Sequence, residues 1–247
     1  MLKTKIYVTA LLSFALKIAF AQSVTQVSHF DKVIVSPHIE VTFIEGNEEK
    51  VIIENSTVSN DKINIKVNGK TLRIYLDDAK EVDKTETINE NGNKVKRPVY
   101  TGTVVSATVI YKTLEELSVR GEETFVCKSV LKGEKFRLKI YGESEVFLNE
   151  VSLGELRTTI YGESNLVIKA GSVKEQKYTA YGESTVNSLA INNNTTKITV
   201  YGESNFQLNV SDEIKLTAYG EASVEYKGNP TITKGVHFGE LKINKID

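Results

Sequence analysis

The residues of this chain that could do chemistry recur at a nearly fixed step along the sequence. The tetrapeptide Tyr-Gly-Glu-Ser begins at Tyr141, Tyr161, Tyr181 and Tyr201, and Tyr-Gly-Glu-Ala begins at Tyr219. Each copy supplies a phenol, which can donate and accept hydrogen bonds, and a carboxylate, which can accept them or bind a cation. If the copies stack, these groups form a repetitive surface that could bind a ligand.

The motif glutamates would then form one column of like charges. They are Glu122, Glu143, Glu163, Glu183, Glu203 and Glu221. Two unit charges about 5 Å apart repel by roughly 0.8 kcal/mol in water. A basic column four residues before the tyrosines, hydrogen bonds from corner amides, or a row of calcium ions could offset this repulsion. We favour ion pairing and expect neither a metal site nor another cofactor, because one carboxylate per repeat is a sparse ligand set.

The binding residues that we predict are the five motif tyrosines, Tyr141, Tyr161, Tyr181, Tyr201 and Tyr219. A stacked ladder of rings would stabilise the surface, at about 0.5–1.5 kcal/mol for each contact. A flat aromatic strip would instead bind a glycan or a partner protein. Both interpretations remain open from the sequence.

Catalysis finds little support, and we predict no catalytic residue. The three histidines, His29, His38 and His237, lack the spacing of metal ligands, and no GxSxG nucleophile motif occurs. Charged groups repeat evenly instead of converging on one point. A carbohydrate-active enzyme, either a lyase or a hydrolase, remains the alternative because polysaccharide lyases also use parallel β-helices.

Glycine marks each repeat. The motif glycines are Gly121, Gly142, Gly162, Gly182, Gly202 and Gly220, which are 18 to 21 residues apart. Before each glycine the residues alternate, which predicts a strand. The inward side of that strand is predicted to hold Leu138/Ile140, Thr158/Ile160, Tyr178/Ala180, Ile198/Val200 and Leu216/Ala218. After the glycine, a second inward set is Val146/Leu148, Leu166/Ile168, Phe206/Leu208 and Val224/Tyr226, with Ser144, Ser164, Ser184, Ser204 and Ala222 in the corner.

A unit of about 20 residues with two strands cannot close a core alone, but stacked units can. We therefore predict an all-β fold, a single-stranded parallel β-helix with coils of about 20 residues. At about 4.8 Å between coils, six coils give a rod roughly 29 Å long.

The chain divides into three parts. Residues 1–21 have the basic start, apolar stretch and Ala-Phe-Ala ending of a signal peptide, for which a membrane anchor is the alternative. Residues 22–247 form the β-helix domain. In it, residues 28–113 are irregular β-coils with a charged loop at 77–98, and residues 114–247 are the regular coils. A separate small β domain is the alternative for the irregular part.

The charge balance of the chain limits the classes of partner that it could bind. The chain has 31 Lys and Arg against 32 Asp and Glu, and three of the lysines lie in residues 1–21. This balance argues against nucleic acid. The single cysteine, Cys127, occupies an apolar position of the repeat, so we predict a buried thiol. We expect no membrane span after signal cleavage. Homo-oligomerisation through exposed strand edges is open, although the charged ending disfavours end-to-end growth.

The entry at residues 30–56, the strand "LRIYL", the charged segment and the ending from Gly228 together resemble the head-GIN-domain putative auto-transporter adhesin family. The resemblance covers residues 29 to 243. It implies a right-handed parallel β-helix and a bacterial envelope setting, and it brings no catalytic residues. Corners of that family are runs of Gly and Ser, whereas here they are Tyr-Gly-Glu-Ser.

We therefore expect a non-enzymatic, exported β-solenoid of the cell envelope, adhesin-like or scaffolding. It would lie in the periplasm, at the cell surface or outside the cell, and bind a glycan or an envelope protein through its outward ladders. A cation-stabilised structural spacer is a further alternative.

Overall fold

The computed structural model describes residues 23–82, 84–90 and 92–247. The predicted signal peptide, residues 1–21, lies outside the described residues. Strands hold 74% of the chain, and the described residues contain a short 3-10 helix, η1 (Asn60–Lys62), but no α-helix. The all-β prediction is therefore confirmed. None of the described segments forms a helix with the length and apolar character that a membrane crossing requires.

The regular coils contain long strands that bend at their corners. They are β10 (Glu116–Gly121), β11 (Thr124–Cys127), β12 (Leu131–Gly142), β13 (Glu145–Leu148), β14 (Val151–Tyr161), β15 (Asn165–Ile168), β16 (Gly171–Lys227), β17 (Thr231–Phe238) and β18 (Leu241–Lys245).

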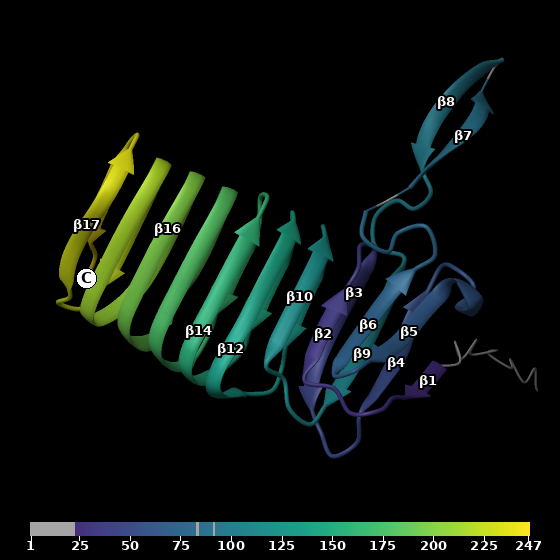
Figure 1. Ribbon diagram of the computed structural model, residues 1–247, viewed down its shortest axis with the longest axis horizontal. Helices are drawn as coiled ribbons and strands as arrows, with labels where there is room; N and C mark the ends of the chain where they lie inside the picture. The colour runs from purple at the N-terminus through teal and green to yellow at the C-terminus, as the bar shows by residue number, and fades with distance from the viewer. Residues whose placement is uncertain (1–22, 83, 91) are drawn as a thin grey trace, which may run out of the picture.

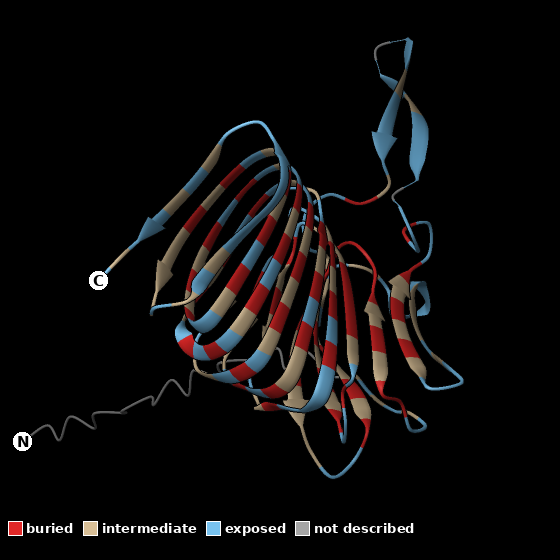
Figure 2. Cartoon of the chain, turned by 60° about the vertical axis from the view of Figure 1, so that its left-hand side comes forward, coloured by how far each residue is buried: buried red, intermediate tan, exposed pale blue. Residues whose placement is uncertain are grey.

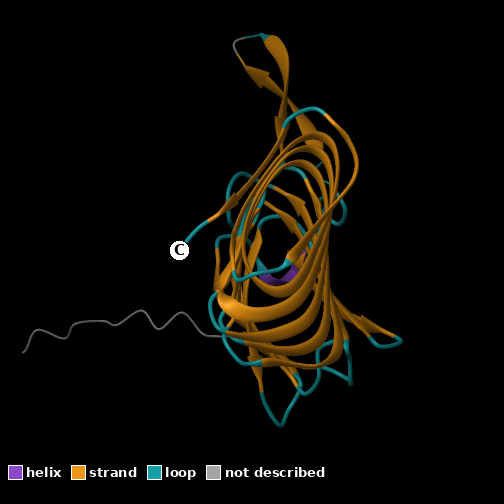
Figure 3. Cartoon of the chain, turned by 90° about the vertical axis from the view of Figure 1, so that its left-hand side faces the viewer, coloured by secondary structure: helices purple, strands orange, loops and turns teal. Residues whose placement is uncertain are grey.

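Successive coils stack in parallel register. Ile140 of β12 pairs with Ile160 of β14, which pairs with Ala180 of β16. The stack runs as a row of parallel bands, and a view along it shows each coil as a flattened loop (Figures 1 and 3). The β-solenoid of about six turns and about 20 residues per coil is as predicted.

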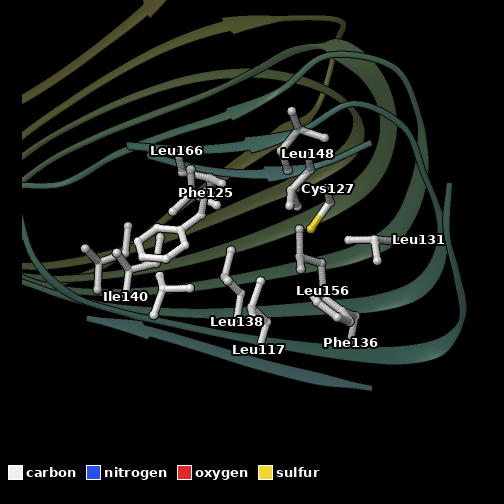
Figure 4. Close-up of a cluster of buried hydrophobic side chains, with 14 of the residues drawn as sticks. Leu117, Phe125, Cys127, Leu131, Phe136, Leu138, Ile140, Leu148, Leu156 and Leu166 are labelled. Atoms are coloured by element: carbon white, nitrogen blue, oxygen red, sulfur yellow. The ribbon is translucent and has the colours of Figure 1, made fainter. Parts of the chain in front are cut away.

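The core lies inside this loop. All ten residues assigned inward before the glycines are buried, and those after the glycines are buried except the half-buried Tyr226. Buried residues alternate with exposed or half-buried ones along most strands of the regular coils (Figure 2). Leu138, Ile140, Leu148 and Leu156 meet in the interior, with Cys127 as a buried free thiol beside them (Figure 4). Each such side chain contributes about 1.5–3 kcal/mol by its burial.

Glycine is required at the corners for two reasons. The backbone of Gly182 has φ +112°, a conformation that residues with a Cβ rarely adopt. A Cβ at Gly182 would also lie 2.8 Å from the carbonyl oxygen of Gly162 in the preceding coil. The corners can stack this closely only because the residue at this position, glycine, has no side chain.

The first part of the chain builds the other end of the same sheet. Its strands are β1 (Ser23–Gln26), β2 (Lys32–Val35), β3 (Ile39–Glu45), β4 (Lys50–Ser56), β5 (Ile63–Asn68), β6 (Thr71–Leu76) and β9 (Val105–Tyr111). β2 and β3 pair in parallel with β10 and β11, and β6 and β9 pair in parallel with β2 and β3. β4 and β5 then pair antiparallel with β9 and β6, and β1 with β4, which ends the solenoid.

The charged segment 77–98 is not a loop throughout. It contains an antiparallel hairpin of β7 (Thr85–Glu90) and β8 (Asn93–Pro98), which projects away from the solenoid (Figure 1). Ile88 pairs across the hairpin with Val95, and Arg97 forms an ion pair with Glu90 at 2.8 Å. The loop prediction was wrong for these strands because it weighed charge and overlooked cross-strand pairs, which stabilise a hairpin locally.

The last coil, formed by β17 and β18, differs from the others. Lys234 takes the register position of the buried Leu216, and Lys245 that of Tyr226. The pairing also contains a bulge between Leu216 and Ala218. Exposed lysines at register positions that hold apolar or aromatic residues in the coil before, together with a bulge, disfavour addition of a further strand.

Replacing a corner glycine should destabilise the fold strongly. We expect Gly182→Ala to lower the free energy of unfolding by about 3 kcal/mol or more, since strained backbone alone costs about 1–3 kcal/mol and a close contact adds to it. The matched control is Gly69→Ala, where φ is +59° and a Cβ would meet nothing within 4 Å. It should lose about 1–2 kcal/mol. Equal losses in urea denaturation would contradict this account of the corner.

Candidate functional site

The motif tyrosines form one continuous stack along the solenoid. Parallel register places Tyr141 beside Tyr161 and Tyr161 beside Tyr181. Consecutive ring centroids lie 4.8 to 5.0 Å apart, and the ring planes differ by 3° to 6°. This step equals the spacing of neighbouring strands in a sheet. The predicted stacked ladder is therefore present.

Stacking decides which part of each tyrosine faces solvent. Tyr161, Tyr181, Tyr201 and Tyr219 have exposed fractions of 37% to 41%. Because the neighbouring rings cover both faces of Tyr161, Tyr181 and Tyr201, the exposed parts are ring edges and hydroxyl groups. A ligand cannot lie flat on these rings. The surface instead presents a row of hydroxyl groups that can donate and accept hydrogen bonds.

Two residues that we did not predict complete the ladder. The guanidinium group of Arg120 lies 5.1 Å from the centroid of Tyr141, and the ring of Phe238 lies 5.9 Å from that of Tyr219. Phe238 is followed by Gly239 and Glu240, so aromatic-Gly-Glu occurs once more with phenylalanine in place of tyrosine. A search for that looser pattern would have found this corner.

The motif glutamates are all exposed, and the predicted compensation by the basic column is wrong. Among the described residues, the carboxylates of Glu122, Glu143, Glu163, Glu183, Glu203 and Glu221 have no ion pair and no hydrogen bond. Four of the five basic residues pair with other acids, and Lys197 has no ion pair among the described residues. These pairs are Arg137–Glu116 at 2.9 Å, Arg157–Glu155 at 2.8 Å, Lys177–Glu175 at 2.9 Å and Lys215–Glu213 at 3.0 Å. These paired acids lie beside the basic column and precede the glycine of their own corner by at least five residues.

These pairs shift the pKa of their carboxyl groups. Burial acts to raise the pKa of Glu155, but the hydrogen bond from Lys177 and the charges of Arg157 and Lys177 outweigh it, so the pKa is lowered. The pKa of Glu116 is lowered in the same way by Lys139 and Arg137. A lowered carboxyl pKa stabilises the fold above the unfolded value, and this stabilisation is lost as the pH falls through the folded pKa.

Hydrogen bonds from serine hold the corners together. The hydroxyl groups of Ser144 and Ser164 each donate to the carbonyl oxygen of the preceding corner glycine at 2.9 Å. Ser184 and Ser204 make longer contacts of 3.4 and 3.5 Å. Within the part of the chain that the structure describes, no group of three or more metal-ligating side chains could hold an ion. The stack is thus built from backbone, serine and tyrosine.

The first corner differs from the others because Glu123 takes the place of the buried serine. Its side chain is 3% exposed and accepts a hydrogen bond from the amide of Glu122 at 3.0 Å. His38 opposes it from the neighbouring level with φ +69°, and its Nδ1 donates to the carbonyl oxygen of Gly102 at 2.7 Å. Glu81, from the segment before the hairpin, pairs with both Arg73 and Arg120.

Glu123, His38, Glu81 and Gly102 line a cleft of about 280 Å³ that also reaches Tyr141. Burial raises the pKa of Glu123, and the charge of His38 and backbone hydrogen bonds act partly against that rise. This corner is therefore where the repeated surface meets residues that do not repeat.

Comparison with known families gives one match that spans most of the chain. The family model described as "Putative auto-transporter adhesin, head GIN domain" matches residues 29–230. No protein with curated annotation matches the chain.

Solved structures share the fold. A putative adhesin from Bacteroides fragilis superposes with a TM-score of 0.73 at 17% identity, and one from Parabacteroides merdae with 0.66 at 16%. A protein from Parabacteroides distasonis titled "Putative lipid binding protein" superposes with 0.63 at 16%. Each comparison covers 92% of this chain and 96% of the other. At these identities the similarity establishes a common fold.

Removing one ring from the middle of the ladder should destabilise the protein. Tyr181→Ala loses two stacked contacts, so we expect the free energy of unfolding to fall by about 1–3 kcal/mol. Tyr181→Phe keeps both contacts and should change it by less than about 0.5 kcal/mol. Chemical denaturation measures both variants. Similar losses in the two would show that the hydroxyl group, and not ring stacking, stabilises the ladder.

The buried carboxyl group at the first corner should give stability an opposite pH dependence to the surface pairs. The pKa of Glu123 is raised from its ordinary value of 4.5, so its contribution is full below that value and is lost as the pH rises through the folded pKa. Glutamine does not titrate. We therefore expect the Tm of the wild type minus that of Glu123→Gln to fall between pH 4 and pH 8.

The matched control is Glu155→Gln, in which a carboxyl group with a lowered pKa is removed. There the same Tm difference should rise between pH 4 and pH 8. A Glu123 difference that also rises would mean that its carboxylate is better stabilised in the folded state than in the unfolded state.

Proposed function

The chain belongs to the putative auto-transporter adhesin, head GIN domain family, and we propose that it binds a glycan or protein partner at the bacterial cell envelope without catalysing a reaction. An exported, adhesin-like protein fits both the family and the structural neighbours. We place it in the periplasm, at the cell surface or outside the cell. The predicted signal peptide supports that placement.

One observation carries the proposal: the same polar groups recur at every coil on an exposed corner. Hydroxyl groups of Tyr161, Tyr181 and Tyr201 follow one another at the ring spacing of 4.8 to 4.9 Å. The column of exposed glutamates runs beside them. A partner that repeats its own polar groups could engage several coils at once, and linked weak contacts give much higher affinity than single ones.

The stacked rings define how such a partner would be held. Sugar hydroxyl groups or protein side chains would form hydrogen bonds with the phenol groups and donate hydrogen bonds to the glutamate carboxylates. Half-buried threonines on the same face, Thr159, Thr179 and Thr199, add further hydroxyl groups. Because no ion pair within the described residues neutralises the glutamate column, a partner with cationic or hydroxyl donors is favoured over an acidic one.

A carbohydrate-active enzyme is the second candidate, and it would use the first corner. Catalysis needs acid and base groups that converge on one point. Along the ladder the same carboxylate recurs in every coil, whereas Glu123 and His38 occur once and line a cleft. Release of reducing ends from a polysaccharide, abolished by Glu123→Gln, would favour this alternative.

The proposal is tested by binding to glycan arrays and to labelled envelope proteins. The triple variant Tyr161→Phe/Tyr181→Phe/Tyr201→Phe keeps the ring stack and removes three hydroxyl groups. We expect its affinity to fall at least about 10-fold, since each hydrogen bond contributes about 0.5–1.5 kcal/mol. A matched control on another outward column is Asn187→Ala/Gln207→Ala, which should bind like the wild type.

A second triple variant, Glu163→Gln/Glu183→Gln/Glu203→Gln, separates charge from hydrogen bonding. Partners with cationic groups should bind it more weakly and with less dependence on salt. Binding that is unchanged in both triple variants, at wild-type stability, would remove the ladder corner as the contact surface.

A further inference from the structure

The solenoid has an unpaired strand edge on its flank, away from both ends. β12 pairs with β14 from Leu131 onward, but it pairs with β10 only from Arg137 onward. In the coil before it, the loop at residues 112–115 takes the place of a strand on this side. Among the described residues, no strand pairs with the outer edge of residues 131–136.

Backbone hydrogen bonds define this edge. The amide of Leu131 donates to the carbonyl oxygen of Glu150 in the following coil at 3.0 Å. Since successive amides of a strand point to opposite edges, that of Lys132 points to the open side. β12 then turns a corner, with residues 132–135 all exposed, and pairing with the preceding coil resumes beyond it, where the amide of Arg137 donates to the carbonyl oxygen of Glu115 at 2.9 Å.

The open edge borders a groove of about 360 Å³ with an apolar base. Leu114 and Leu131 line it and are 8% and 2% exposed. Tyr111 lines it as well; it is 3% exposed, and its hydroxyl group has no hydrogen-bond partner among the described residues. Because that hydroxyl oxygen has almost no solvent-accessible surface, Tyr111 presents its ring to the groove.

The rim of the groove is charged but balanced. Lys132 forms an ion pair with Glu45 at 2.9 Å, and Lys112, Glu115, Glu134 and Lys135 surround it. Gly133 is in the middle of the edge, and a Cβ placed there would meet nothing within 4 Å. Glycine within a strand allows another backbone to approach closely. The edge is therefore open to a neighbour.

We propose that this groove binds an extended peptide segment of a protein partner, which adds a strand to the open edge of β12. The segment would run parallel to β12, as the neighbouring strands on this side do. It would lie against residues 131–136 on the edge opposite to the one that pairs with β14. Its backbone would pair with the edge at Lys132.

The groove also determines which side chains of that segment would fit. Apolar residues at alternate positions would face Leu114, Leu131 and the ring of Tyr111. With equal numbers of acids and bases on the rim, the segment needs no strong net charge. This surface is distinct from the ladder corner and does not depend on what the ladder binds.

The probe is a fluorescein-labelled peptide of sequence VSLGELR, which copies residues 151–157, the strand that pairs with the other edge of β12. Binding to the protein is followed by anisotropy, and amide hydrogen exchange is followed at Lys132. We expect saturable binding with slower exchange at that amide. A VSLGELR peptide with N-methylated amides at alternate positions should bind at least about 10-fold more weakly, because it lacks backbone donors.

Variants at one position separate backbone from side chain. Lys132→Pro removes the outward amide and is compatible with a strand edge, so binding should weaken at least about 10-fold. Lys132→Ala keeps the amide and should bind within about 2-fold of the wild type. If Lys132→Pro lowers the Tm, the comparison of the two peptides on the wild-type protein tests the proposal without any variant.

Three outcomes would overturn the proposal. They are no binding of the probe, equal binding of the N-methylated peptide, and equal effects of Lys132→Pro and Lys132→Ala. A dimer in sedimentation that disappears in Lys132→Pro would also overturn it, because the edge would then be occupied by a second copy of the chain.

Discussion

The stacking of one corner glycine on the next is the constraint on which the rest of this structure depends. A side chain at Gly182 would collide with the carbonyl oxygen of Gly162. Successive coils can therefore approach to the normal spacing of paired strands only because glycine occupies this corner position. Once that spacing is set, every other column follows from register. Tyrosine rings meet at 4.8 to 5.0 Å, serine hydroxyl groups reach the corner carbonyl groups, and like carboxylates come side by side.

The same register has favourable and unfavourable consequences. Stacked rings and serine hydrogen bonds stabilise the corner, while the glutamates repel one another with no ion pair among the described residues. Further along the strands, four of the five residues of the basic column form ion pairs with neighbouring acids, such as Arg157 with Glu155. The charges on the strands before the corner are therefore mostly compensated by ion pairs, whereas the motif glutamates at the corner are not. This arrangement is the one expected of a surface that binds a partner.

Repetition made part of this structure predictable from sequence. Five copies of one motif were enough to predict the coils, the inward residues and the position of Tyr141 above Tyr161. The parts without a repeat were not predictable in the same way. The strands β6 and β9 lie outside β2 and β3, although they follow them in the chain, and no repeated motif marks this reversal of order. The partners of Arg137 and Lys215 and the hairpin of β7 and β8 likewise depend on side chains that no periodic pattern aligns.

The two ends of the solenoid are closed by different means, antiparallel strands at one and exposed lysines in place of apolar or aromatic residues at the other. Because neither closure belongs to the repeating unit, the number of units between them can change without rebuilding an end. Duplication of one unit would lengthen the molecule by one rung of about 4.8 Å and add one tyrosine and one glutamate. The length of the solenoid and the number of its repeated surface groups would therefore change together, by one coil at a time.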